Sequence, residues 1–218
     1  MKFAFYMNCV SAHQLPLAKE VAELVGPENF CYVDAGEKSE SAQSAETQGL
    51  KFKVQSLKSP ERDGAREWLE TADVMLTGMR DLELFERRTK KGLRTYYTSE
   101  RWFKPIGIGG GGRWTVEAPG SLRMFVPGYR RMVKRFVKWA NEDPGARVLA
   151  IGPWARLDFL GMGVRADKIV GWGYFVAPST SKRLNIQTSK HLNILWCGRM
   201  LGLKRVDTII RAASQIKV

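Results

Sequence analysis

Two cations near the end of the sequence lie where α/β proteins bind phosphates. Arg199 and Lys204 follow the short apolar run at residues 194–197. An apolar run without polar alternation predicts a strand buried on both faces of a parallel sheet. From Val206 onwards, apolar residues recur with the period of a helix. Gly198 forms the tight crossing between the two elements, and phosphates bind at such strand-to-helix junctions because helix N–H groups converge there.

The composition limits how many domains the chain can form and which partners it favours. The chain has 218 residues, 44% of them hydrophobic, which is enough for a full core in one or two domains. The formal net charge of +13 favours an anionic partner: a nucleic acid, an acidic membrane face or a phosphorylated small molecule. A merely solvated basic surface explains the same charge.

The three cysteines, Cys9, Cys31 and Cys197, are odd in number and far apart, and each lies in an apolar segment. This spacing suits neither a disulfide framework nor a metal site, so we expect reduced core thiols in a cytoplasmic protein and no bound metal. No stretch of about 18 apolar residues predicts a membrane-spanning helix, and the first residues lack the features of a signal peptide.

Alternating strand and helix patterns predict an α/β protein with a Rossmann-like parallel sheet. The expected strands are residues 2–10, 30–33, 52–57, 73–78, 93–98, 147–151 and 169–176, and the expected helices are 15–25, 62–70, 82–88, 129–140 and 155–162. Residues 178–190 are rich in Ser, Thr, Lys and Asn, which is typical of a linker. We therefore expect a first domain over 1–177 and the first strand and helix of a second Rossmann-like domain over 191–218.

The segment 129–140 predicts a strongly amphipathic helix with a basic polar face that includes Arg130, Arg131 and Lys134. A basic amphipathic helix can lie on an anionic membrane, so these cations are candidates for an acceptor or membrane surface. The alternative is that the apolar stripe packs on the sheet and the cations are solvated. The pattern is compatible with both.

At the end of the chain, the residues resemble a known family. The passages 194–199, 204–207 and 209–212 look like the opening of the donor-binding domain in GT-B glycosyltransferases of the family 4, or glycosyl transferases group 1, type. The family's pattern there is a buried strand, Gly-Arg, an apolar step, Lys-Gly-Val-Asp and an apolar helix. Arg205 stands where the family usually carries glycine. Residues 164–176 are similar to the segment that closes the family's N-terminal domain.

The resemblance implies transfer of a sugar, of the hexosyl type, from a nucleotide-diphosphate donor to a glycan or lipid-linked acceptor at the inner face of a membrane. It also implies retention of the anomeric configuration and no cofactor or metal. Carried over to this sequence, the family roles place Arg199 and Lys204 on the diphosphate. Cations there would stabilise the charge that builds on the β-phosphate in the transition state.

The same resemblance places the acceptor side on loops at the carboxyl ends of the first domain's strands. His13 follows the first expected strand and Glu100 follows the fifth, so these two are the candidate catalytic residues. Arg101 and Trp102 come next and are candidates for acceptor contact, since an indole ring can stack on a sugar. A surface or capping histidine, and an ion pair beside a half-buried Trp, explain these residues equally well.

Two departures from the family pattern bear on this interpretation. The first loop, residues 8–14, lacks the glycines that many relatives have. The family's acidic pair would lie beyond Val218, so we expect a truncated chain that is inactive by itself. The alternatives are a nucleic-acid-binding protein, motivated by the charge but lacking a recognisable motif, and a nucleotide-binding α/β protein without transfer chemistry. Under the family interpretation, no nucleic-acid partner is expected.

Overall fold

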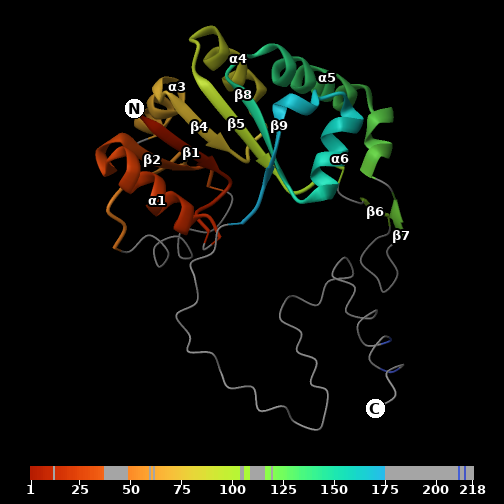
Figure 1. Cartoon of the computed structure of the whole chain (residues 1–218), viewed down its shortest axis with the longest axis horizontal. Helices are drawn as coiled ribbons and strands as arrows, with labels where there is room; N and C mark the ends of the chain where they lie inside the picture. Colours follow the sequence, from red (N-terminus) through yellow and green to blue (C-terminus); the bar gives the residue numbers. More distant parts are fainter. Residues whose placement is uncertain are drawn as a thin grey trace. The chain divides into compact units, whose positions relative to one another are not determined.

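The structure is a computed structural model of the chain (Figure 1). It describes residues 1–11, 13–36, 49–58, 60, 62–103, 106–108, 116–118, 120–174, 211 and 214. The chain divides into two units, Met1–Ala177 and Pro178–Val218. All the strands and helices below belong to the first unit. Gly198, Arg199 and Lys204, and the predicted linker at 178–190, lie outside the described residues.

A seven-stranded parallel sheet forms the centre of the first unit, with the strand order β3-β2-β1-β4-β5-β8-β9. Its strands are β1 (Phe3–Met7), β2 (Phe30–Asp34), β3 (Lys53–Ser56), β4 (Val74–Thr77), β5 (Arg94–Ser99), β8 (Ala146–Ile151) and β9 (Ile169–Trp172). Two short strands, β6 (Ile106–Ile108) and β7 (Val116–Ala118), pair antiparallel beside it. The predicted Rossmann-like α/β fold is confirmed for this unit.

Helices cover the two faces of the sheet unequally (Figure 1). The described helices are α1 (Leu15–Val25), α3 (Arg62–Thr71), α4 (Leu82–Lys90), α5 (Pro127–Glu142) and α6 (Pro153–Met162), with short 3-10 turns η1 (Pro27–Asn29), η2 (Gly120–Phe125) and η3 (Ala166–Lys168). Helix α1 packs on one face, and α3, α4, α5 and α6 share the core on the other.

The side chains of β1 alternate between two hydrophobic cores, one on each face of the sheet. Ala4 and Tyr6 belong to the core beneath α3 to α6, whereas Phe5 and Met7 belong to the core beneath α1. Successive residues of a strand point to opposite faces, so a strand covered on both sides must be apolar throughout. This is why β1 and β2 appear in the sequence as unbroken apolar runs.

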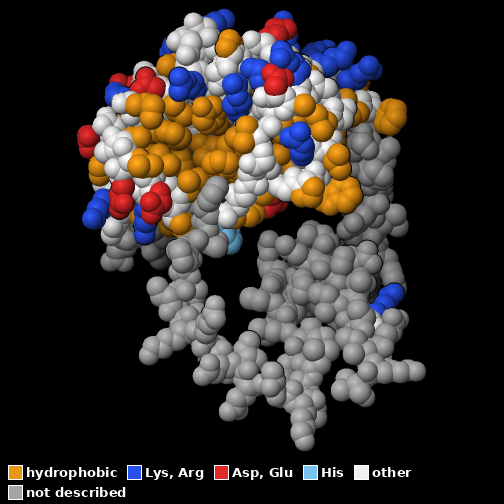
Figure 2. Space-filling model, in the orientation of Figure 1, with side chains coloured by type: hydrophobic (Ala, Val, Ile, Leu, Met, Phe, Trp, Pro, Cys, Tyr) orange, Lys and Arg blue, Asp and Glu red, His pale blue; other side chains and the backbone are white. Residues whose placement is uncertain are grey.

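The structure decides between the two interpretations of the basic amphipathic helix. In α5, Val133, Phe136 and Ala140 are buried, and the other apolar residues of the stripe pack against the same core. Of the two interpretations, packing of the stripe on the sheet is therefore confirmed, and the stripe itself is not available to a membrane. The cations of α5 face outwards, and Figure 2 shows Lys and Arg side chains gathered over this helix.

None of the described helices is long and apolar enough to cross a membrane. Large apolar side chains are nevertheless exposed at particular places. Phe125, the last residue of η2, is 83% exposed, and Val126, which precedes α5, is 55% exposed. Trp154 at the start of α6 is 62% exposed. Leu24 of α1 is exposed as well. Contiguous exposed apolar surface can mark an interaction site, whereas single exposed apolar residues are common on protein surfaces.

Candidate functional site

The strand order places a topological switch point between β1 and β4. From β1 the chain adds β2 and β3 on one side, and then adds β4, β5, β8 and β9 on the other. In open α/β sheets, ligands bind outside the carboxyl ends of the strands near such a point. The segments that follow β1, β4, β5, β8 and β9 therefore form the candidate site, which we call the carboxyl edge.

Three side chains from different strand ends meet at the carboxyl edge, and we call them the edge cluster: His13, Glu100 and Tyr174. His13 follows β1, Glu100 follows β5 and Tyr174 follows β9. The Tyr174 hydroxyl donates a hydrogen bond to the Glu100 carboxylate. The ring centroids of Tyr174 and His13 are 5.6 Å apart, with the planes tilted by 46°. The two residues predicted as catalytic thus both contact one tyrosine, which was not among the predicted site residues.

Tyr174 acts as a donor in this cluster. Burial raises the pKa of its phenol above the usual range, and the adjacent Glu100 carboxylate raises it further. The phenol therefore keeps its proton to higher pH than usual, and its hydroxyl donates to Glu100. All three side chains are exposed or half exposed, so a ligand at this edge could reach them.

Contacts with the neighbouring strand β2 anchor the loop after β1. The buried Tyr32 of β2 places its hydroxyl 3.0 Å from the Cys9 carbonyl oxygen and also contacts the Gln14 side-chain amide. The N–H groups of Gln14 and Leu15 both donate to the Ser11 carbonyl oxygen, closing a turn before α1. This anchoring gives the His13 backbone a defined position even though the loop lacks the expected glycines.

Asp158 fixes the segment after β5. One of its carboxylate oxygens accepts hydrogen bonds from the backbone N–H groups of Trp102 and Phe103, each at 3.0 Å. The Arg101 guanidinium pairs with the same carboxylate at 3.4 Å. Asp158 lies on α6, so this carboxylate ties the loop that carries Glu100 and Arg101 to a helix. Its position inside a helical pattern gave no sign of this role in the sequence.

The expectation that Trp102 presents a stacking face to an acceptor is wrong in this structure. Trp102 is 1% exposed, and its ring packs against Tyr97, Phe136 and Phe159. The guanidinium of Arg80, which follows β4, lies 4.2 Å from the centroid of the same ring. Three aromatic neighbours and a cation cover the ring, so a sugar cannot stack on it. Burial of an aromatic ring of this size contributes to the stability of the core. Trp102 is a core residue.

Arg101 instead lies beside another tryptophan. Its guanidinium carbon is 5.6 Å from the centroid of the Trp154 ring, which is largely exposed. Trp154 follows β8 and Arg101 follows β5, and these two strands are neighbours in the sheet. Arg101, predicted as a candidate for acceptor contact, therefore lies next to the exposed Trp154. A pattern of Gly-Pro-Trp directly after a buried strand was the signal that could have found it.

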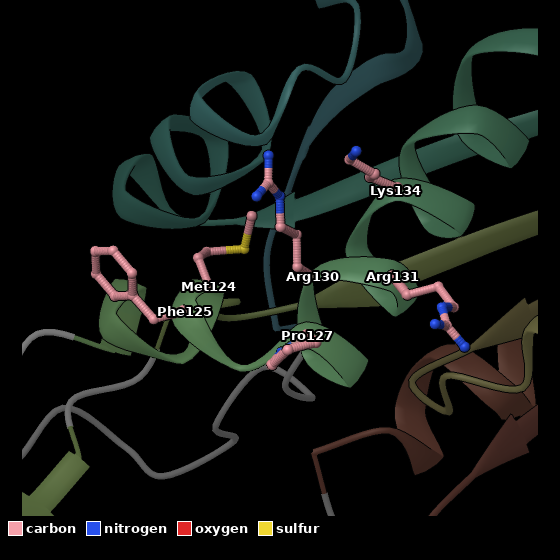
Figure 3. Close-up of a pocket in the computed structure, with 6 residues that line it drawn as sticks. All are labelled: Met124, Phe125, Pro127, Arg130, Arg131 and Lys134. Carbon is pink, nitrogen blue, oxygen red and sulfur yellow. The ribbon is translucent and has the colours of Figure 1, made fainter.

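The remaining predicted cations line a pocket of about 480 Å³ at the start of α5. Its described lining residues are Met124, Phe125, Pro127, Arg130, Arg131 and Lys134. Figure 3 shows Arg130 and Lys134 extending from the same side of α5, whereas Arg131 points away from them. Phe125 lies at the adjoining end of η2. The three predicted residues thus share one surface with an exposed aromatic ring.

No protein-family model matches the sequence, and no curated protein matches it either. Among solved structures, Alr3699/HepE of Anabaena in complex with UDP matches with a TM-score of 0.50 and 13% identity. The match covers 80% of this chain and 44% of HepE. At this identity the likeness shows a shared fold, and the chain spans less than half of HepE.

Two further structures are similar at lower TM-scores. The apo form of the lipopolysaccharide outer core galactosyltransferase WaaB has a TM-score of 0.44 and 14% identity, covering 83% of this chain and 47% of WaaB. L-threonine 3-dehydrogenase from Trypanosoma brucei has a TM-score of 0.41 and 12% identity, covering 69% of this chain and 53% of that enzyme.

Proposed function

We propose that the whole protein is a glycosyltransferase that moves a sugar from a nucleotide-diphosphate donor to an acceptor hydroxyl. The edge cluster is the observation that carries this proposal. It places a carboxyl group, that of Glu100, at the sheet edge where α/β proteins bind ligands, with an imidazole and a phenol beside it. A carboxylate in that position can take the proton of an attacking hydroxyl.

The fold shared with HepE supports the donor half of the proposal, since HepE was solved with UDP bound. In this chain, Arg199 and Lys204 would bind the diphosphate and stabilise the departing phosphate, and the proposed reaction needs no metal because these cations supply the positive charge. We further propose that residues 191–218 begin the donor-binding domain, that 178–190 is the linker, and that the transferred group is a hexose. For its anomeric configuration to be retained, the acceptor hydroxyl would attack the anomeric carbon on the face that the diphosphate leaves.

Release of the nucleoside diphosphate tests the role of Glu100. The full-length protein is incubated with UDP-, GDP- and ADP-sugars and a glycan-containing lipid extract, and the released diphosphate is followed. Replacing Glu100 by Gln keeps the shape but removes the base, so the rate should fall about 10²- to 10⁴-fold. Glu86→Gln, an exposed carboxylate paired with Arg135 on the α4–α5 surface, is the control and should leave the rate unchanged. Equal rates for Glu100→Gln and the parent protein would contradict the proposal.

We also propose that the surface at the start of α5 contacts an anionic membrane, where a lipid-linked acceptor would be found. Phe125 and Val126 are exposed apolar side chains, and Arg130, Arg131 and Lys134 lie in the next turns of the chain. An apolar tip flanked by cations can enter the headgroup region while the cations bind lipid phosphates. The buried stripe of α5 takes no part in this contact.

Co-sedimentation with vesicles tests the membrane contact. Binding to phosphatidylglycerol-containing vesicles, and not to pure phosphatidylcholine, should be lost on changing Arg130 and Lys134 to Glu. Phe125→Ser with Val126→Ser should weaken it as well. The matched controls are Lys19→Glu with Arg66→Glu, and Leu24→Ser, whose parent side chain is 84% exposed on α1. If the controls reduce binding as much as the test variants, the contact is not made by this surface.

A further inference from the structure

We propose that Trp154 and Arg101 form a subsite for an acidic sugar ring at the carboxyl edge. The inference rests on the proposed glycosyl transfer, for which it names an acceptor subsite and its chemistry. Trp154 is 62% exposed, so a ligand at this edge can reach its indole ring. The apolar face of a pyranose can cover such a ring, as sugars commonly stack on aromatic faces.

Arg101 is held in a fixed orientation beside that ring. Its Nε and Nη2 groups point to Asp158, at 3.4 Å each, and its guanidinium carbon is 5.6 Å from the Trp154 ring centroid. Asp158 in turn accepts from two backbone N–H groups and is only 10% exposed. A guanidinium that is already oriented loses little conformational entropy when a ligand arrives.

The third nitrogen of the Arg101 guanidinium, Nη1, is the group that a ligand would bind. Nη1 donates to no described residue, and the side chain is 37% exposed. A guanidinium prefers carboxylate or phosphate oxygens, to which it makes charge-assisted hydrogen bonds. Arg101 lies over one face of the Trp154 ring. A sugar ring stacked on the other face, with a carboxylate substituent that reaches past the edge of the indole to the guanidinium, would engage both groups. The excess positive charge of the chain favours the same acidic ligand over a neutral one.

The topology also fits an acceptor position. Parallel pairing aligns Ser99 of β5 with Ala150 of β8, so the segments bearing Arg101 and Trp154 leave the sheet at the same edge. Glu100 directly precedes Arg101 in the chain. A sugar held by Arg101 and Trp154 therefore lies at the edge that carries the proposed base.

Fluorine NMR of the 5-fluorotryptophan-labelled chain tests the subsite without any nucleotide. The chain has seven tryptophans, and the signal missing from Trp154→Phe identifies Trp154. Titration with methyl β-D-glucuronide should shift this signal saturably and leave the signal of the buried Trp102 unmoved. Methyl β-D-glucoside should bind about tenfold more weakly, because it offers no carboxylate to the guanidinium.

Arg101→Gln should reduce glucuronide affinity to that of the glucoside, with the other tryptophan signals unchanged as evidence of folding. Arg165→Gln, which removes an exposed arginine paired with Asp167, is the matched control and should leave the affinity as it was. A motionless Trp154 signal, or equal affinity for both sugars, would overturn the inference. Because no donor is present, such a failure is distinct from a failure of the proposed transfer, which the diphosphate-release assay reports.

Discussion

At the scale of single residues, Asp158 has the largest influence on the candidate site. One carboxylate satisfies two backbone N–H groups and orients Arg101, while Glu100 lies one residue earlier in the same segment. A side chain that touches no ligand therefore positions the proposed base and the proposed sugar subsite together. Its effect comes from the cost of leaving partly buried donors without an acceptor.

Replacing Asp158 by Asn should destabilise the fold by about 1–3 kcal/mol, because the amide cannot accept from both N–H groups and Arg101 as a carboxylate does. Urea unfolding monitored by circular dichroism measures the change. Asp167→Asn is the control: its pair with Arg165 is more than half exposed on both sides, so the loss should be below about 1 kcal/mol. Similar losses in the two variants would show that Asp158 is an ordinary surface carboxylate.

Cys31 gives a pH-dependent prediction at the same scale. Burial raises the pKa of its thiol from 9.0 to about 12, with Lys53 partly opposing the shift. The folded state keeps a proton that the unfolded chain loses above pH 9, so the stabilising contribution is complete below pH 9 and is lost as the pH rises toward about 12. The slope should approach about 1.4 kcal/mol per pH unit in that window.

Cys31→Ala should make the decline in stability above pH 9 shallower, because the titrating thiol is gone. The comparison uses slopes from urea unfolding at several pH values, since the substitution itself also removes buried atoms. An unchanged slope would mean that other groups cause the alkaline loss. In the folded protein the thiol should also resist alkylating reagents, as a buried protonated thiol is a poor nucleophile.

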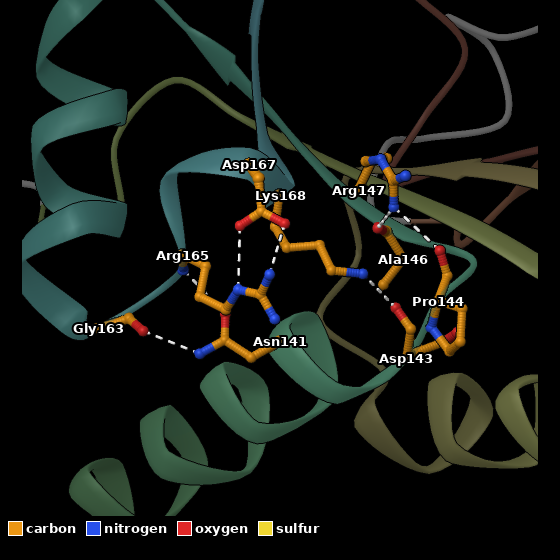
Figure 4. A network of polar contacts seen from close by, with 9 residues as sticks. All are labelled: Asn141, Asp143, Pro144, Ala146, Arg147, Gly163, Arg165, Asp167 and Lys168. Carbon is orange, nitrogen blue, oxygen red and sulfur yellow. Dashed lines mark hydrogen bonds and ion pairs between the residues drawn. The ribbon is translucent and has the colours of Figure 1, made fainter.

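At the scale of elements, polar contacts at the opposite end of the sheet connect α5, β8 and α6 (Figure 4). Asn141, in the last turn of α5, donates to the Gly163 carbonyl oxygen and accepts from the Arg165 N–H, both at 2.9 Å. The ammonium group of Lys168 donates to the Asp143 carbonyl oxygen at 2.6 Å. These bonds fix the ends of the helices whose other ends carry the cations and Trp154.

Asn141→Ala should cost about 1–2 kcal/mol, since two backbone groups lose their partner at a half-exposed position. Glu142→Ala is the neighbouring control. Its 4.0 Å pair with Lys138 is largely exposed, so its loss should stay within about 0.5 kcal/mol. Thermal unfolding of both variants measures the difference, and a greater loss for Glu142→Ala would be inconsistent with this role for Asn141.

Most elements could be predicted from the sequence because strands and helices of a parallel α/β fold have distinct apolar periods. The unbroken run of β1 and the stripe of α5 were such signals, and both match the structure. The observed boundaries differ from the predicted ones by a few residues. Helix α5 begins at Pro127, because proline suits the first turn of a helix. Strand β9 ends at Trp172 and not at residue 176. A residue such as Tyr174, just past a strand end, was therefore hidden inside the predicted strand.

The site was less predictable because it depends on which strand ends are neighbours. His13 and Glu100 were found from their positions after strands, but their shared partner Tyr174 arrives from β9 only through the tertiary fold. Trp102 and Trp154 look alike in the sequence. Only packing separates the one that completes the core from the one that faces water.

At the scale of the whole molecule, the charge and the sheet edge point to one class of ligand. A net charge of +13, cations at the start of α5 and Arg101 at the carboxyl edge all favour anions. A nucleic-acid-binding protein would share the charge, and its affinity would fall steeply with salt because many counterions are released. A specific nucleotide site depends instead on a few defined side chains, which Arg199 and Lys204 are proposed to supply.

Calorimetric titration of UDP, GDP and ADP into the protein tests the central claim most directly. One nucleotide should bind saturably, and Arg199→Ala or Lys204→Ala should each weaken binding by about tenfold to a hundredfold, as expected for a lost charge-assisted hydrogen bond. Lys190→Ala, in the predicted linker, is the matched control and should bind as the parent does. Absence of nucleotide binding, together with tight and strongly salt-dependent binding of single-stranded DNA, would contradict the claim.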